Sequence, residues 1–233
     1  SFQTQITPTS GIVSSRKLPI YCVNIESPKV AISFDAAWGN EQTETLLSIL
    51  EKYHVKTTFF MTGGWVESYP DDVKAIAAAG HDLGNHSEKH KQMSTLSADE
   101  CKQEIQKVHD KVKELTGQDM ILFRPPYGDY NDTLIDAANS LGYHVIQWNI
   151  DSLDWKDYGA DNIVSRVVDN DHLGNGAIIL MHNGAKYTPD ALERVLTVLQ
   201  EKGYEIVPIS QLIYKENYEM DHEGRQFIKG NAK

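Results

Sequence analysis

Seven short apolar runs, separated by longer segments with helical periodicity, constrain the fold of this chain more than any other feature. The runs lie at 29–34, 57–61, 81–85, 120–123, 144–148, 177–181 and 204–208. Short apolar runs of this kind are typical of strands buried on both faces. Because each is followed by a helix or a long loop, we expect a parallel sheet covered by helices in an α/β protein. The period alone does not distinguish a closed barrel from an open, doubly wound sheet.

Three of the connecting segments carry clear signals for the ends of helices. A capping box, an N-terminal proline and terminal glycines are the signals concerned. One predicted helix begins at the Ser97–Glu100 capping box and ends at Gly117. A second begins at Thr188–Pro189 and ends at Gly203, and a third lies between Pro70 and Gly80.

The chain has 233 residues and contains no recognisable linker, internal repeat or low-complexity segment. A single domain of this length is within reach of one α/β barrel. We therefore expect an N-terminal arm over 1–28, one domain over 29–214 and a polar, poorly ordered tail over 215–233.

The net charge of -11 argues against nucleic acid as a partner, because phosphates call for a basic face. No stretch approaches the length of a membrane span. The chain begins at Ser1 with a polar run, so we expect that an upstream signal or anchor precedes it in the full protein. This favours an extracellular or cell-envelope location; the alternative is a cytoplasmic protein that begins with the scar of a cleaved tag. Pairing of Cys22 with Cys101 stays open.

The chemically distinctive residues stand directly after the predicted strands. They are Asp35 after the first run, His86 after the third, Arg124 after the fourth, Asp151 and Asp154 after the fifth, and His182 after the sixth. The carboxyl ends of parallel strands gather on one rim of a barrel, where barrel enzymes carry their active sites. Scattered surface residues would not select strand ends so regularly, so the sequence indicates an enzyme.

His86 and His90 lie four residues apart and share one face if the segment is helical. Two imidazoles at this spacing suit zinc or a similar divalent ion. The segment is not the HExxH motif of metalloproteases, because Ser87 follows His86 and Glu88 stands one place late. Two solvated histidines on an exposed turn are the alternative interpretation.

Three further segments have residue types suited to catalysis or sugar binding: RPPYG (124–128), DSLDW (151–155) and LMH (180–182). Two prolines stiffen the first, which would aim the Arg124 guanidinium and the Tyr127 N–H at a fixed point. The second supplies two carboxylates and an aromatic wall. The third ends a buried strand with a histidine that could act as a general acid. A plain turn, a core tryptophan and a core histidine are the structural alternatives.

Together these segments resemble the polysaccharide deacetylases with the NodB homology domain, also called family 4 of the carbohydrate esterases. Five short motifs of that family occur in order, as SFDA, HSEKH, RPPYG, DSLDW and LMH. The resemblance covers residues 29–213 and implies a distorted (β/α) barrel of about seven parallel strands. Similarity in SFDAAWGN and VIQWNIDSLDW points further to the peptidoglycan deacetylases associated with spore formation.

The resemblance implies metal-dependent hydrolysis of N-acetyl groups on a cell-wall polysaccharide, such as peptidoglycan or a chitin-like polymer. His86 and His90 would bind the metal, a zinc ion or else cobalt or manganese. Asp35 would act as the base on a water molecule, and His182 would protonate the departing amine. The Tyr127 N–H would help to stabilise the oxyanion. The protein would act as a monomer on an acetylated polysaccharide.

Four more residues acquire supporting roles from the same resemblance. Arg124 would fix the carboxylate of the base, and Asp154 would orient the acid and keep it protonated. Trp155 and Leu180 would line the pocket that receives the acetyl methyl group. The loops around the site also contain candidate stacking surfaces for a sugar: Trp38, Trp65, Tyr127 and Tyr130.

One position departs from the family pattern. The first motif usually reads TFDDG, and its second aspartate is the third protein ligand of the metal, but Ala36 stands there in this chain. Catalytic zinc usually has three protein ligands, so we expect weaker metal binding. Asn40 and Glu88 are nearby candidates to compensate.

Three interpretations therefore compete. The first is an active deacetylase, with an acetyl-xylan esterase as its substrate variant. The second is a glycan-binding pseudoenzyme, motivated by Ala36. The third is a metal-dependent hydrolase of another class, which the absence of HExxH and of a second metal cluster disfavours.

Overall fold

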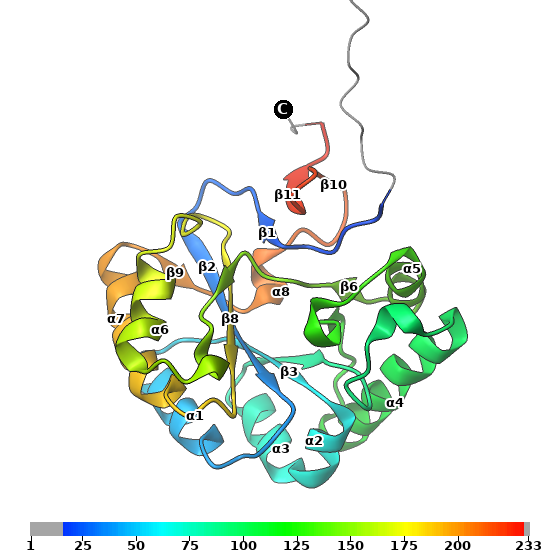
Figure 1. The fold of residues 1–233 in the computed structure, drawn as a ribbon, viewed down its shortest axis with the longest axis horizontal. Helices are drawn as coiled ribbons and strands as arrows, with labels where there is room; N and C mark the ends of the chain where they lie inside the picture. Colours follow the sequence, from blue (N-terminus) through cyan, green and yellow to red (C-terminus); the bar gives the residue numbers. More distant parts are fainter. Residues whose placement is uncertain (1–15, 231–233) are drawn as a thin grey trace, which may run out of the picture.

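A curled half-barrel of parallel strands forms the centre of the computed structural model, which describes residues 16–230 (Figure 1). Residues 1–15 of the predicted arm and 231–233 of the predicted tail lie outside that range. The strand order is β6–β5–β4–β3–β2–β8–β7, and β9 pairs with the start of β2. The strands are β2 (Lys29–Ala36), β3 (Thr58–Met61), β4 (Asp82–Asn85), β5 (Leu122–Phe123), β6 (His144–Val145), β7 (Ile150–Asp151), β8 (Ile178–His182) and β9 (Glu205–Ile206). All seven predicted strands are confirmed, and β7 is an addition.

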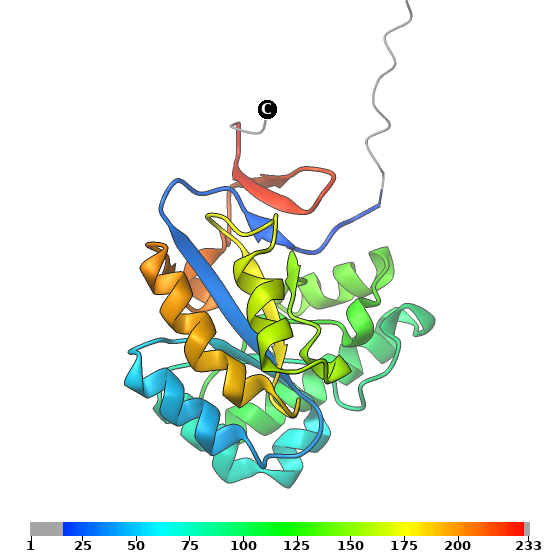
Figure 2. The same cartoon turned by 60° about the vertical axis from the view of Figure 1, so that its left-hand side comes forward.

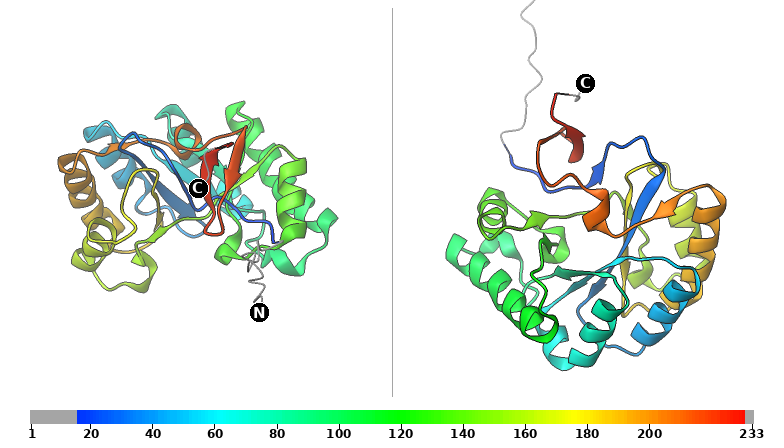
Figure 3. Two further views of the ribbon diagram at one scale, coloured as in Figure 1. Left: turned by 90° about the horizontal axis from the view of Figure 1, so that it is seen from above. Right: turned by 180° about the vertical axis from the view of Figure 1, so that it is seen from behind.

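Helices cover the outer face of this sheet, as the view from behind shows most clearly (Figure 3). They are α1 (Thr43–Lys52), α2 (Gly63–Ser68), α3 (Pro70–Ala78), α4 (Ala98–Thr116), α5 (Asp132–Ser140), α6 (Ala160–Val168) and α7 (Thr188–Glu201). The three predicted helices correspond to α4, α7 and α3. The Ser97–Glu100 capping box is formed at the start of α4, and Gly117 ends that helix with a φ of 74°. Three short 3₁₀ turns lie at η1 (Met93–Thr95), η2 (Pro126–Gly128) and η3 (Asp154–Lys156).

The alternation of side chains along β2 decides which residues reach the inner face. Val30, Ile32 and Phe34 belong to the large core between sheet and helices, whereas Ala31 belongs to a smaller core inside the curl. Because side chains alternate along a strand, Ser33 and Asp35 follow Ala31 on the inner face. The short helix α8 (Ile209–Leu212) packs its apolar residues into the same inner core.

A small second sheet, made from the two ends of the described chain, lies beside the open side of the half-barrel (Figure 2). It consists of β1 (Cys22–Val23), β11 (Arg225–Ile228) and β10 (Tyr218–Met220), with β1 parallel to β11. The expectation of a poorly ordered tail is therefore wrong over 215–230, because pairing with β1 supplies the backbone partners that the tail itself lacks. Isolated bridges tie the arm to the main sheet, where Ile20 pairs with Ile146 and Cys22 with Ala177.

Two sequence-level questions are answered by the fold. Cys22 and Cys101 are both buried and both free, so they do not form a disulfide. Within residues 16–230, none of the helices combines the length and apolarity that crossing a bilayer requires.

Candidate active site

A cavity of about 440 Å³ lies at the carboxyl ends of the central strands. Its walls come from segments far apart in the sequence, as a rim of parallel strand ends predicts. The lining residues are Asp35, Ala37, Trp38, His86, His90, Pro125, Tyr127, Gly128, Trp148, Asp151, Trp155, Leu180 and His182. The structure thus brings seven of the nine predicted site residues to the cavity wall, and the other two, Arg124 and Asp154, contact lining residues from behind.

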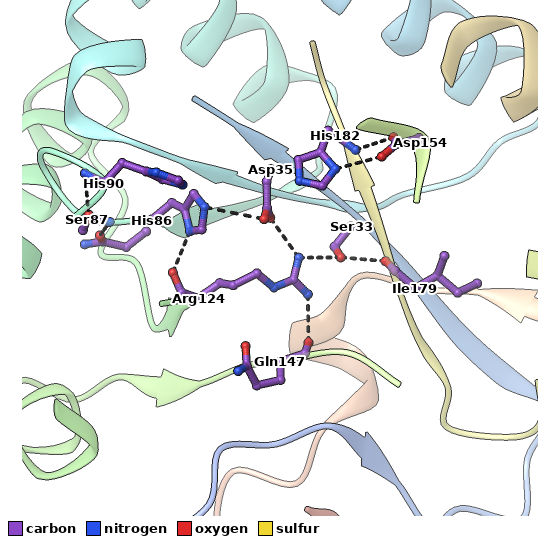
Figure 4. Close-up of polar contacts among 11 residues, drawn as sticks. Ser33, Asp35, His86, Ser87, His90, Arg124, Gln147, Asp154, Ile179 and His182 are labelled. Atoms are coloured by element: carbon purple, nitrogen blue, oxygen red, sulfur yellow. Dashed lines mark hydrogen bonds and ion pairs between the residues drawn. The ribbon is translucent and has the colours of Figure 1, made fainter. Parts of the chain in front are cut away.

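Asp35 is held from below by the fully buried guanidinium of Arg124 (Figure 4). Arg124 Nη1 donates to Asp35 Oδ1 at 2.9 Å and to Ser33 Oγ at 2.8 Å, and Nη2 donates to the carbonyl of Gln147 at 2.9 Å. Burial by itself raises the pKa of Asp35, but the His86 imidazole and the Arg124 guanidinium outweigh it and hold the pKa below its ordinary value. The carboxylate is therefore ionised and oriented.

His86 and His90 lie together, but not on a helix. Ser87 and His90 have positive φ angles of 70° and 53°, and the Ser87 Oγ accepts the His90 N–H at 3.0 Å, which closes a tight turn. The two ring centroids are 4.9 Å apart. The segment is therefore not helical, and a left-handed turn brings the two rings together.

The hydrogen bond behind His86 leaves its other nitrogen for the cavity. Nδ1 lies 2.6 Å from the Arg124 carbonyl, which can only accept, so we assign the proton to Nδ1. Nε2 then faces Asp35 Oδ2 at 3.5 Å as a free lone pair. Burial lowers the pKa of His86 to about 4 and also lowers that of His90, so both rings favour the neutral form. A neutral imidazole with its rear nitrogen anchored is the form that ligates metals.

A third protein ligand is missing from this pair. Among residues 16–230, no group of three or more histidine, cysteine, aspartate or glutamate side chains is arranged to hold a metal ion. Ala36 is buried in the outer core and does not line the cavity. Neither candidate to compensate lines the cavity: Asn40 donates to Asp72, and Glu88 is ion-paired with Lys111. The residues present therefore do not fit a catalytic zinc site with three protein ligands.

His182 stands across the cavity from these histidines, next to Asp35 in the register of β2 and β8. Asp154 Oδ1 lies 2.8 Å from His182 Nδ1, which leaves Nε2 for the cavity. Burial lowers the pKa of His182, but the hydrogen bond and charge of Asp154 more than offset that effect and the pKa is raised. The site thus combines one ionised carboxylate with one histidine that favours the protonated form.

Exposed aromatic side chains surround this centre. Trp38 is 47 % exposed and stacks on His182 with ring centroids 5.6 Å apart. Tyr127, at a φ of 61°, places its ring 4.6 Å from that of His90. Trp155 is 51 % exposed on the cavity wall. Flat apolar surfaces around polar groups are suited to a sugar ring.

Two of the four predicted stacking residues lie elsewhere. Trp65 is buried in the outer core, where its Nε1 donates to the carbonyl of Gly39, and Tyr130 hydrogen-bonds Tyr21 away from the cavity. Trp148 lines the cavity without having been predicted. Its position after β6, in VIQWN, is the sequence signal that could have identified it.

Comparison with known proteins places this geometry in a family. The family model described as polysaccharide deacetylase matches residues 23–146. Over 210 residues the chain is 34 % identical to the uncharacterized protein YlxY of Bacillus subtilis (strain 168), covering 90 % of this chain and 65 % of YlxY. It is 31 % identical to the peptidoglycan-N-acetylmuramic acid deacetylase PdaA of the same strain, covering 84 % of this chain and 75 % of PdaA.

A solved structure adds the fold. BA3943 of Bacillus anthracis, titled a CE4 family pseudoenzyme, superposes with a TM-score of 0.81 at 35 % identity, over 85 % of this chain and 69 % of that one. A mutant of BA3943, titled as having restored enzymatic activity, superposes equally well at 36 % identity, over 85 % of this chain and 72 % of that one. The chain therefore belongs to the polysaccharide deacetylase family, family 4 of the carbohydrate esterases.

Proposed function

We propose that this chain hydrolyses N-acetyl groups on a cell-wall polysaccharide of the peptidoglycan type. The observation that carries the proposal is the pairing of Asp35 and His182 on adjacent strands at the cavity wall. Each has its own buried partner, Arg124 for the carboxylate and Asp154 for the imidazole. The two groups are thereby biased toward opposite protonation states, which is what one base and one acid require.

The reaction assigns a proton to each group. Asp35 takes a proton from a water molecule while the water oxygen bonds to the acetamide carbonyl carbon. His182 gives the proton on Nε2 to the amide nitrogen as the carbon–nitrogen bond breaks, which yields acetate and an amino sugar. We assign the Tyr127 N–H to the oxyanion, and Trp155 and Leu180 to the pocket for the acetyl methyl group.

The family resemblance also implies a divalent metal. In our proposal His86 and His90 bind it weakly, as zinc or else cobalt or manganese, because the third ligand is absent. We place the activity in the cell envelope or outside the cell. The proposal extends to a monomer whose catalytic domain spans 29–214, between an arm at 1–28 and a tail at 215–233.

The test measures acetate released from peptidoglycan fragments, chitin oligomers and acetylated xylan. The protein is first stripped with a chelator, and zinc, cobalt or manganese is then restored in a titration. We expect release that rises with metal and disappears in Asp35→Asn, while the exposed control Asp171→Asn retains it. Release from xylan alone would identify an esterase instead.

A second candidate function is glycan binding without turnover. Ala36 and the two-ligand site favour it, and BA3943 at 35 % identity is titled a pseudoenzyme. Acetate release that stays at background in saturating metal, together with intact binding of chitin oligomers, would establish this alternative and overturn the proposed catalysis.

A further inference from the structure

We infer that the cavity selects an uncharged N-acetylhexosamine over N-acetylmuramic acid, and that Asp151 determines this specificity. The inference rests on the proposed function for the kind of polymer, and it goes further by naming the sugar. Asp151 ends β7 opposite Leu180 and lines the cavity, yet the proposed reaction gives it no role.

The charge of Asp151 is not matched by a cation. Asp35 is paired with Arg124 and Asp154 with His182, but Asp151 forms no ion pair with any basic side chain of residues 16–230. Its Oδ1 accepts the Leu153 N–H at 2.9 Å, which fixes the side chain at the wall. The described lining contains no lysine or arginine, and the histidine on it that favours the protonated form, His182, is already paired with Asp154.

Aromatic faces and an unmatched carboxylate together describe a site for a neutral sugar. The exposed faces of Trp38 and Trp155 can cover the apolar faces of sugar rings, and a carboxylate accepts hydrogen bonds from their hydroxyl groups. N-acetylglucosamine offers hydroxyl donors and no charge, so it suits this combination.

N-acetylmuramic acid differs from N-acetylglucosamine by a lactyl ether on one of the sugar's hydroxyl oxygens. In a peptide-free glycan the lactyl group ends in a carboxylate, which needs a cation in the site or a path away from other anions. Asp151 supplies repulsion, and the described lining supplies no cation that lacks a carboxylate partner, so binding should be weakened by like charge. Lys156 lies beside one wall of the cavity, with its Nζ 5.3 Å from the Trp155 ring centroid, but it does not line the cavity itself.

The test compares two probes of equal length on chelator-treated protein, by calorimetric titration. One is the tetramer of N-acetylglucosamine, and the other is the peptide-free peptidoglycan tetrasaccharide that alternates N-acetylglucosamine with N-acetylmuramic acid. We expect the neutral tetramer to bind at least about tenfold more tightly, with a ratio that shrinks as salt screens the repulsion. Chelation removes any metal charge, so the readout does not depend on the loaded enzyme.

Asp151→Asn should bring the ratio close to one, chiefly by strengthening the anionic probe, because asparagine keeps an oxygen acceptor for the Leu153 N–H. Asp171→Asn, an exposed change of equal charge, should leave the ratio as it is. An unchanged ratio in Asp151→Asn overturns the inference. So does a Lys156→Gln variant that loses binding of the anionic probe, because the lysine would then be a lactyl clamp.

The inference and the proposed function fail in different ways. Tighter binding of the muramic acid probe by the unmodified chain, with acetate release present, overturns the inference alone. Preference for the neutral probe without acetate release in any metal overturns the proposed catalysis and supports the inference. Binding of neither probe overturns both.

Discussion

Asp154 holds His182 with both oxygens of one carboxylate. Oδ1 lies 2.8 Å from the imidazole Nδ1, and Oδ2 accepts the backbone N–H of His182 at 2.7 Å. Thr188 Oγ1 donates a third hydrogen bond to Oδ2 at 2.6 Å. One fully buried aspartate therefore fixes the ring, its tautomer and the end of β8 together.

Replacing this carboxylate should disable the acid. We expect Asp154→Asn to lower kcat by roughly 10²-fold or more, because the ring loses its orienting partner and its counter-charge. Burial is then opposed only by the smaller effects of the Asp35 and Asp151 charges, so the pKa of His182 should fall, and the limb of the pH–rate profile that reports loss of the acid's proton moves to lower pH. Thr188→Val removes a donor and keeps the charge, and it should leave that limb in place. An unmoved limb in Asp154→Asn would contradict the assigned role.

The buried pair of Arg124 and Asp35 should contribute to stability as well as to the site. Arg124→Met leaves a buried carboxylate without its partner, and we expect the free energy of unfolding to fall by about 3–5 kcal/mol in urea denaturation. The double variant with Asp35→Asn removes both charges and should recover part of the loss. Strictly additive losses would mean that the two side chains are not energetically coupled.

The positions of the site residues could be predicted from the sequence because two patterns determine them: the spacing of the apolar runs along the chain and the alternation of side chains within a strand. Apolar runs locate the strands, and alternation along β2 sends Asp35 to the face opposite Phe34. Parallel strands then bring distant ends to one rim, which is why Asp35 and His182 are neighbours although 146 positions separate them in the sequence.

Other features depend on contacts that a local pattern does not contain. The turn at 86–90 is left-handed at Ser87, a conformation that side-chain hydrogen bonds stabilise and that histidine spacing does not reveal. Trp65 is buried because the Gly39 carbonyl satisfies its indole N–H, and no neighbour in the sequence indicates that partner. The strand β11 forms because β1 pairs with it from the other end of the chain.

The role of the Trp38 indole in sugar binding can be tested without replacing Trp38 itself. A Cβ on Gly184 would lie 2.2 Å from the Trp38 Nε1, so Gly184→Ala should push the indole away from His182. We expect binding of chitin oligomers to weaken by about 2–10-fold, the value of one aromatic contact. Quenching of tryptophan fluorescence measures it. Gly64→Ala is the matched control, since a Cβ there meets nothing, and equal binding by both variants would remove Trp38 from the sugar site.

His81 should make the fold sensitive to acid. It is buried, its Nδ1 accepts the Thr57 N–H at 2.9 Å, and burial with a contribution from Lys56 lowers its pKa to about 4. In the unfolded chain this histidine becomes protonated near pH 6.5, so between pH 6.5 and 4 the unfolded chain binds more protons than the folded one. Stability is therefore lost as the pH falls from about 6.5 toward 4, by up to roughly 3 kcal/mol from this residue. Urea denaturation at pH 7 and 4.5 measures the loss.

Carboxylates also contribute to acid sensitivity, so the comparison needs a variant. His81→Gln can still accept the Thr57 N–H, and it should lose less stability between the two pH values than the unmodified chain. His172→Gln changes an exposed histidine and should not alter the difference. A pH dependence in His81→Gln equal to that of the unmodified chain would exclude His81 as its source.

Restoring a carboxylate at position 36 should restore the metal site. Ala36 is fully buried beside the base, and its carbonyl accepts the Thr62 N–H at 3.1 Å. Without metal, Ala36→Asp would bury a charge in the outer core and should lower the melting temperature. With zinc, the new carboxylate can join His86 and His90, so affinity should rise by about tenfold or more and the melting temperature should recover. Ala37→Asp is the control, because it adds the same charge at a residue that already lines the cavity. Equal tightening in both variants would mean that negative charge alone attracts the metal, and destabilisation of Ala36→Asp without tighter binding would mean that position 36 is not a ligand position in this fold.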